Sequence, residues 1–155
     1  MTSLVDKTNT FLAQKRIAVA GVSHTQDDAA NGIFRKLRDH DYAVFAVNPN
    51  AETVEGAPCY PDVKSIPGGV DGVVIVTRPE VTEQIVRDCA EAGIKHVWIH
   101  RSFVGSSVSD AAVEFCRDHD IAVIDGGCPM MFLEPDFGHR CMKWMMRVTG
   151  RLPAS

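Results

Sequence analysis

The residues best suited to chemistry stand directly after short apolar runs of the chain. In chain order they are Gly21, Val22, Ser23 and His24; Thr77, Arg78 and Pro79; and Cys128 and Pro129. A glycine loop offers backbone N–H groups, and a guanidinium matches the geometry of a phosphate, so this set favours a phosphorylated ligand. No nucleophile–base pair and no metal motif stands at readable spacing, so the sequence predicts binding without catalysis and without a metal.

Two further positions complete the predicted site. Asn31 closes the first loop, and Asn48-Pro49-Asn50 ends the second apolar run. A dinucleotide-binding enzyme would carry G-x-G-x-x-G in the first loop and an acidic residue after the second strand. Here Ser23 replaces the second glycine and Asn48 stands near the place of the acid, so an NAD(P)-dependent oxidoreductase is the alternative rather than the first hypothesis.

Five apolar runs alternate with helical patterns and position these residues. We expect strands at 17–20, 42–47, 72–76, 96–100 and 121–124, and helices at 3–14, 31–40, 80–92, after Ser107 or Ser109, and at 136–149. Residues 51–69 are expected to be irregular, with one helical turn near 62–66, because prolines and glycines punctuate them.

This alternation predicts an α/β fold, a Rossmann-like doubly wound parallel sheet in three layers, α/β/α. The predicted strand order is 3-2-1-4-5. Ligands of such sheets bind beyond the carboxyl ends of the strands, so the site should form where the loops 21–31, 48–50, 77–79, 100–103 and 125–131 meet. The 155 residues are read as one domain, with a core at 15–129 and a C-terminal helix at 136–149.

The order of several short segments resembles that of the small stand-alone CoA-binding proteins. These proteins are similar to the CoA-binding domain of the succinyl-CoA synthetase α subunit. The segments are Ile17–Ser23, Val47–Asn50, Tyr60-Pro61, Arg78-Pro79, Val97–Ile99 and Cys128-Pro129. The resemblance implies non-covalent binding of coenzyme A or an acyl-CoA. It places the pyrophosphate at Gly21–Ser23 and the adenosine at Asn48 and Pro49. It also places Thr77–Pro79 along the phosphates and Cys128-Pro129 near the pantetheine arm. A synthetase-like partner is a further possibility.

The composition of the chain limits which partners and which cellular location we expect. The formal net charge of −4 argues against nucleic acid, and no apolar run approaches the ~20 residues that span a bilayer. No signal-peptide core precedes Lys15, and five scattered cysteines indicate free thiols, so we expect a cytoplasmic protein.

Several residues keep open alternatives. Arg78 binds phosphate or forms a surface salt bridge, Cys128 is buried or reactive, and His24 and His100-Arg101 either contact the ligand or do not. Asp27 and Asp28 repel phosphate unless they face solvent or Asp28 caps the helix. The last helix carries a basic stripe beside methionines and Trp144. It either packs on the sheet with a solvated edge, contacts the 3′-phosphate or an acidic partner, or forms a homodimer seam.

Overall fold

A single mostly parallel sheet of seven strands organises the protein. The computed structural model describes residues 3–25, 28–102, 105–133 and 137–150, with the side chains of 137–139 left aside. The strands are β1 (Arg16–Ala20), β2 (Ala43–Val47), β3 (Thr53–Val54), β4 (Ala57–Tyr60), β5 (Gly72–Ile75), β6 (His96–Ile99) and β7 (Ala122–Asp125). They lie in the order β3-β4-β2-β1-β5-β6-β7, and the β3–β4 pair is the antiparallel one.

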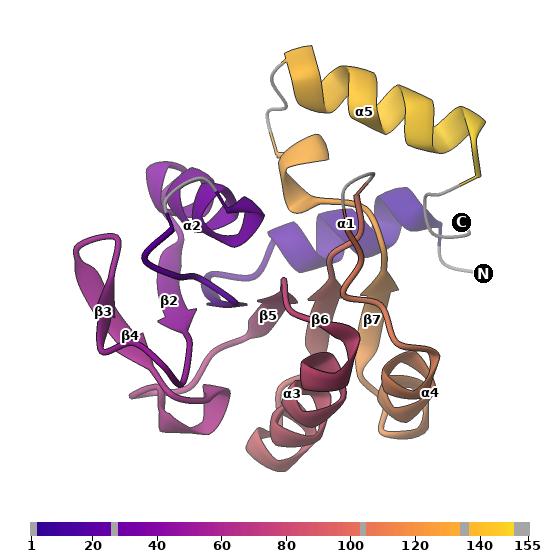
Figure 1. Ribbon diagram of the computed structural model, residues 1–155. Helices are drawn as coiled ribbons and strands as arrows, with labels where there is room; N and C mark the ends of the chain where they lie inside the picture. The colour runs from indigo at the N-terminus through magenta and orange to yellow at the C-terminus, as the bar shows by residue number, and fades with distance from the viewer. Residues whose placement is uncertain (1–2, 26–27, 103–104, 134–136, 151–155) are drawn as a thin grey trace.

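Helices cover both faces of this sheet and make three layers, which confirms the predicted fold class. The α-helices are α1 (Leu4–Leu12), α2 (Ala29–Asp39), α3 (Pro79–Ala92), α4 (Asp110–Asp118) and α5 (Phe137–Val148); the short 3-10 helices are η1 (Val63–Ser65) and η2 (Pro129–Met131). In Figure 1, α1, α2 and α5 lie above the sheet, and α3 and α4 lie below it. Within the described residues, none of the helices combines the length and the apolar character that a membrane crossing requires.

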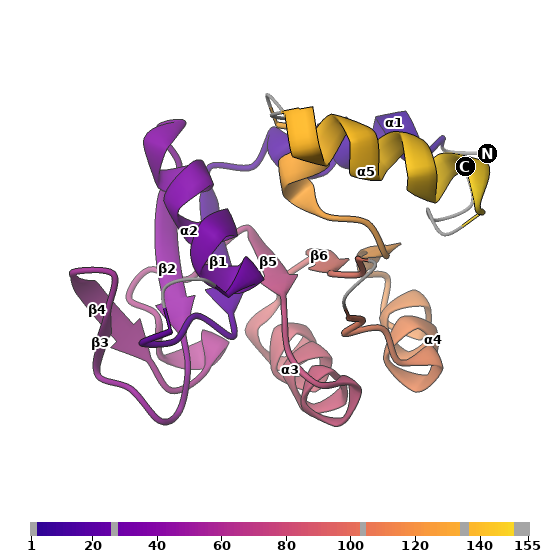
Figure 2. The same ribbon diagram turned by 45° about the horizontal axis from the view of Figure 1, so that its top comes forward.

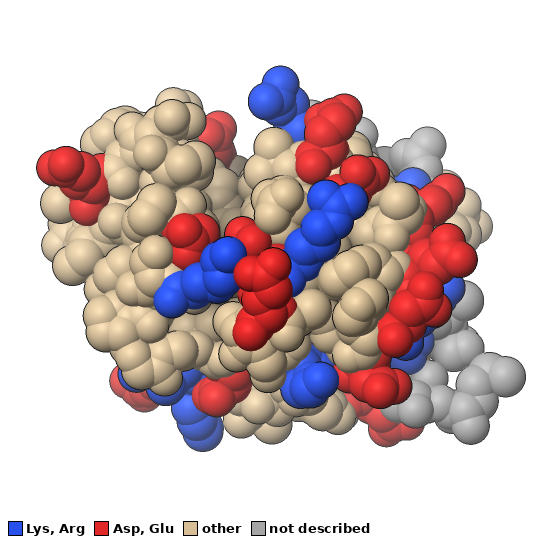
Figure 3. All heavy atoms as spheres, turned by 90° about the horizontal axis from the view of Figure 1, so that it is seen from below, with Lys and Arg blue, Asp and Glu red and all other residues tan. Residues whose placement is uncertain are grey.

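Each face of the sheet has its own hydrophobic core. On the upper face Trp98 is fully buried and meets Phe11 edge-on, with ring centroids 5.5 Å apart. On the lower face Cys89 and Cys116 are buried among the aliphatic side chains of α3, α4 and the central strands. Burial on both faces explains why the central strands read as continuous apolar runs. Figure 3 views the lower side, where acidic and basic side chains are mixed and no continuous basic patch forms.

The predicted strand order 3-2-1-4-5 was wrong. The five strands expected from the sequence lie in the order 2-1-3-4-5. The run at 72–76, assigned as the third strand, pairs with β1 as β5 and not with β2. The place beside β2 belongs to β4, which lies within the segment 51–69 that the sequence predicts to be irregular. Counted with β4 as the third strand, the parallel order is 3-2-1-4-5-6, which is the Rossmann order. The expected helical turn in this segment is confirmed as η1.

A tight turn joins β3 and β4 and fastens them to α2. Its first central residue, Glu55, has a φ of +52°, a left-handed conformation that few residues other than glycine adopt. The Glu55 carboxylate is almost fully buried and lies 2.8 Å from the Arg35 guanidinium of α2. It also accepts a hydrogen bond from the Asn31 amide, and Arg38 donates to the Glu55 carbonyl. These contacts compensate for the unfavourable backbone conformation.

The end of β1 has no room for a side chain. Gly21 has a φ of +106°, and a Cβ there would lie 2.0 Å from the carbonyl oxygen of Val76. The Gly21 N–H donates to Val47, and the Val76 N–H donates to Ala20, so the chain is pinned between β2 and β5. Only glycine combines this conformation with this close approach.

We expect Gly21→Ala to destabilise the protein by about 3 kcal/mol, because the new Cβ must separate β1 from β5 while the backbone stays strained. Gly93 at the C-terminus of α3 is a matched control, with a φ of +73° and open space around it. Gly93→Ala should cost only about 1 kcal/mol. Urea unfolding of both variants measures the difference, and equal losses would contradict the steric argument.

Candidate functional site

A cleft of about 510 Å³ opens at the carboxyl ends of β5 and β6. Its walls are the N-terminus of α2, the segment from β5 into α3, and the segment from β6 toward α4. The lining residues are Asp28, Ala29, Val76, Thr77, Arg78, Pro79, His100, Ser102, Gly105, Ser106 and Ser107. This is the edge of the sheet where the fold was predicted to bind its ligand, close to the reversal of strand order beside β1.

Asn31 shapes the first loop from inside the protein. Its side chain is fully buried: Oδ1 accepts from the Ser23 N–H at 3.0 Å, and Nδ2 donates to the Ser23 carbonyl and to Glu55. Gly21 and Ser23 were predicted to cradle pyrophosphate with their backbone, but both amides are already bonded within the protein. An anion at this loop would therefore meet the first-turn amides of α2, which lack partners within the helix.

Asp28 stands at the N-terminus of α2 without capping it. No side-chain hydrogen bond of Asp28 caps the helix, and its carboxylate instead accepts from the Ser23 hydroxyl at 2.9 Å. The residue is exposed and lines the cleft. It therefore places a negative charge at the mouth of a site whose other features attract anions. Asp27, the second acidic residue of this loop, lies outside the described residues.

Arg78 occupies the corresponding place at the start of α3. It is the N-cap residue, its side chain is exposed and lines the cleft, and Pro79 follows at the first helical position. Within the described part of the chain, the Arg78 guanidinium forms no ion pair, so the surface salt bridge considered for it does not form there. A cation at the positive end of a helix dipole is unfavourable unless an anion is near. Arg78 and the α3 N-terminus thus both favour a bound anion.

Hydroxyl groups fasten the two remaining walls together. The Ser107 hydroxyl accepts from the Thr77 N–H at 2.9 Å. The Thr82 hydroxyl donates to the Ser107 carbonyl at 2.8 Å and lies 3.0 Å from the Thr77 hydroxyl. Thr82 and Ser107 are both buried, so the start of α3 and the segment before α4 are held as one unit.

Part of this wall was not predicted from the sequence. Of the pair His100-Arg101, which the sequence offers as a ligand contact, His100 lines the cleft and Arg101 does not. Ser102 and Ser106 were not identified, because isolated serines carry no motif, and Ser107 was considered only as a helix cap, a place that Ser109 takes. Their signal is topological: they lie just beyond the carboxyl end of β6, on the side where ligands bind. An isolated antiparallel bridge between Arg101 and Ser106 folds this segment back on itself.

The remaining predicted residues lie away from the cleft wall. Asn48 donates to the Val22 carbonyl at 3.0 Å and accepts from the Asn50 N–H, which joins the end of β2 to the first loop. Val22 is fully buried, and Pro49 is exposed. His24 is exposed in the first loop. Contact of these residues with a ligand stays a prediction.

Cys128 belongs to the hydrophobic core of the upper face. It is 3% exposed, and burial raises the pKa of its thiol to about 11. Burial thus favours the inert thiol over the reactive one, because it disfavours the nucleophilic thiolate. Pro129 is buried as well, at the start of η2. Neither residue lines the cleft, so their expected place beside a pantetheine arm stays a prediction.

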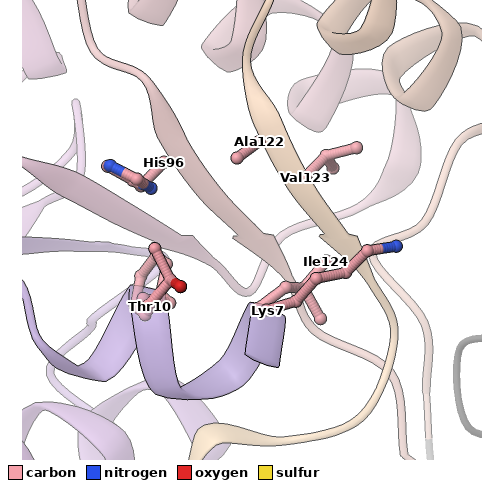
Figure 4. Close-up of a pocket in the computed structure, with 7 residues that line it drawn as sticks. Lys7, Thr10, His96, Ala122, Val123 and Ile124 are labelled. Atoms are coloured by element: carbon pink, nitrogen blue, oxygen red, sulfur yellow. The ribbon is translucent and has the colours of Figure 1, made fainter. Parts of the chain in front are cut away.

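A second hollow lies at the opposite, amino-terminal end of β6 and β7. Figure 4 shows Lys7 and Thr10 of α1 facing His96, Ala122, Val123 and Ile124 across it. Its volume is about 160 Å³, below the ~300 Å³ at which ligand pockets usually begin. Among the residues that the structure describes, no three His, Cys, Asp or Glu side chains are grouped to hold a metal ion.

Known proteins share this domain. The model of the CoA binding domain family matches residues 15–134 of the chain. ADP-forming acetate–CoA ligase I of Archaeoglobus fulgidus is 33% identical over 101 residues, which are 64% of this chain and 15% of the ligase. The α subunit of ADP-forming acetate–CoA ligase II of Pyrococcus furiosus is 29% identical over 76% of this chain and 27% of that subunit. The chain thus spans about a quarter or less of these relatives.

Solved structures agree with this relationship. A hypothetical protein from Pyrococcus horikoshii superposes with a TM-score of 0.77 and 26% identity, covering 84% of this chain and 92% of that one. A dinucleotide-forming acetyl-coenzyme A synthetase of Ca. Korarchaeum cryptofilum, in complex with phosphate and ADP, gives a TM-score of 0.64 and 26% identity over 78% of this chain and 27% of that one. Because the family model matches well over half of its residues, the chain belongs to the CoA binding domain family.

Proposed function

We propose that this protein binds coenzyme A or an acyl-CoA non-covalently in the cleft between α2 and α3, and performs no chemistry of its own. One observation carries the proposal: the N-termini of two helices converge on a single cleft with the guanidinium of Arg78, which forms no ion pair among the described residues. Both helix N-termini present a positive dipole end to an anion, and α2 also presents the free N–H groups of its first turn. A pyrophosphate linking two organic arms suits such a site.

Two features favour coenzyme A over a nicotinamide dinucleotide. The end of β2 carries no carboxylate for a free ribose diol, and the Asn48 amide is engaged with Val22 and its own turn. The family relationship also favours coenzyme A. An NAD(P)-dependent oxidoreductase therefore remains the weaker alternative.

We expect Arg78→Ala to weaken CoA binding about 10- to 100-fold, because it removes a charge-assisted hydrogen bond to phosphate. Isothermal titration with CoA, NAD⁺ and NADP⁺ measures this. Arg87→Ala is the matched control, since Arg87 is an exposed arginine within the same helix and does not line the cleft.

Binding of NAD⁺ or NADP⁺ without binding of CoA would overturn the proposal and favour the oxidoreductase. If Arg78→Ala left the CoA affinity unchanged, the pyrophosphate would not bind at the α3 N-terminus.

Asp28→Asn should act in the opposite direction. Removing the carboxylate at the mouth of the cleft relieves repulsion of about 1 kcal/mol at most in this exposed setting, so CoA should bind about two- to fivefold more tightly. Asp39→Asn, near the far end of α2, makes the same change in net charge away from the cleft. The gain should shrink as salt rises from 0.05 to about 0.5 M, because exposed charges are screened. A gain of equal size in both variants would mean that net charge alone is responsible.

A subunit of an acyl-CoA synthetase-like complex is the second candidate. It is favoured by the ligase relatives, most of whose length lies outside the region similar to this chain. In that role the protein would hold the CoA while a partner supplies the catalytic residues.

The purified protein alone should form no ATP when it is given acetyl-CoA, ADP and phosphate. The reason is that most of the length of the ligase relatives lies outside the region similar to this chain, so the residues that catalyse the reaction are expected on a partner. A coupled luminescence assay for ATP, with free CoA followed by thiol titration, measures both products. Stoichiometric release of ATP and CoA would contradict the absence of catalysis, and the Arg78→Ala variant would then show whether the cleft is its site.

A further inference from the structure

Helix α5 has apolar side chains on two sides, and its own domain uses one of them. Met146 is fully buried and Met142 packs against the same core, so these residues attach the helix beside η2 (Figure 2). On the outward side lie Cys141, Trp144, Met145 and Val148, which we call the outer seam. Their spacing of i, i+3, i+4 and i+7 makes one continuous helical stripe. The helix begins after residue 134, where the match to the CoA binding domain family ends.

The outer seam is exposed. Trp144 is 64% exposed, Val148 61% and Met145 47%. In the described part of the chain, the other large hydrophobic side chains with such exposure are Val5 and Val81, one each on α1 and α3. The seam therefore concentrates apolar surface on one short helix, as interaction sites do.

Cations border the seam along one side. Arg140 and Arg147, seven residues apart, are both exposed, and α5 contains no acidic residue. Lys143 lies next to them, with its Nζ 4.1 Å from the centre of the Phe132 ring. Partial burial and the charge of Arg147 lower the pKa of Lys143. The three cations of α5 contrast with the chain's net charge of −4, which leaves −7 on the remaining residues.

We propose that the outer seam of α5 docks an amphipathic helix of another protein, whose apolar side chains are bordered by carboxylates. The seam's spacing fits a helix laid along it, and Arg140 and Arg147 would pair with the carboxylates. This surface is separate from the CoA cleft, so the proposal goes beyond the proposed function and does not depend on it.

Charge disfavours two other occupants. A second copy would offer its own α5 as the apolar counterpart, and pairing two such helices brings the cations of both together without an acidic residue on either. An anionic membrane would attract α5 but repel the remaining −7 of the molecule. A partner helix with a narrow apolar stripe and acidic borders avoids both repulsions.

Trp144 provides the test, because the protein's other tryptophan, Trp98, is fully buried. The probes are two tryptophan-free helical peptides of about three heptads with leucine at the seam positions, one bordered by glutamate and the other by lysine. The glutamate peptide should shift the emission of the protein to shorter wavelength, saturably and less strongly at high salt. The lysine peptide should not.

Arg140→Glu combined with Arg147→Glu should weaken binding of the glutamate peptide about tenfold or more, since two exposed ion pairs become two repulsions. Arg87→Glu combined with Arg117→Glu is the matched control on α3 and α4, where both arginines are exposed. It makes the same change in net charge and should leave binding unchanged. CoA titration of all variants shows that the fold and the cleft are intact, so failure here is distinguishable from failure of the proposed function.

Three results would overturn the proposal. The first is no response to the glutamate peptide, or an equal response to both peptides. The second is an emission shift with protein concentration alone, accompanied by a dimer in sedimentation velocity, which would identify a second copy as the occupant. The third is a shift with vesicles of phosphatidylglycerol and phosphatidylcholine but none with either peptide, which would identify a membrane.

Discussion

The buried amide of Asn31 is the contact on which the arrangement of the cleft depends. One side chain fixes both backbone groups of Ser23 and reaches the Glu55 carboxylate of the β3–β4 turn. It thereby joins the loop after β1, the first turn of α2 and the edge of the sheet. A buried amide that lost these partners would leave several polar groups unsatisfied, which is costly in a dry environment. Together with the contacts of Arg35 and Arg38 to Glu55, this side chain fixes the position of the α2 N-terminus.

The cleft combines fastened walls with unused amides. Asn31, Thr82 and Ser107 bind their neighbours from inside the protein and leave the first turn of α2 open. At α3, Pro79 has no N–H and the Val81 and Thr82 amides donate to the Arg78 carbonyl, so that helix offers mainly its dipole and the Arg78 side chain. A site arranged before its ligand arrives loses less free energy to ordering when the ligand binds. The one discordant group is Asp28, whose carboxylate is held by Ser23 at the mouth.

The sequence was most informative where local pattern and burial agree. The five main strands and the helices were placed to within a few residues, because strands buried on both faces must be apolar throughout. β4 could not be found in this way. It contains a proline and a half-exposed tyrosine, and its turn uses Glu55 in a conformation that depends on Arg35 and Asn31 across the fold. The error in strand order follows directly from missing β4.

The location of the candidate site could be predicted from the sequence, but only some of the residues that line it could. Thr77, Arg78 and Pro79 were identified because a guanidinium directly after a buried strand has few structural reasons to be there. Asn31 and Asn48 were predicted to bind the ligand, and the structure shows their amides bonded inside the protein. No local pattern distinguishes an amide that binds a ligand from one that holds a loop. The serines beyond β6 become visible only once that loop is folded against Thr77.

Both edge strands of the sheet are short. β3, at one end, has two residues, and β7, at the other, has four. An unpaired strand can recruit another chain through its backbone, and brevity is one of the ways in which proteins prevent such growth. This sheet therefore offers little template for fibril-like extension, even though its interior is rich in valine and isoleucine. Contacts with other proteins are therefore expected to rely on side chains more than on strand pairing, so single substitutions can tune them.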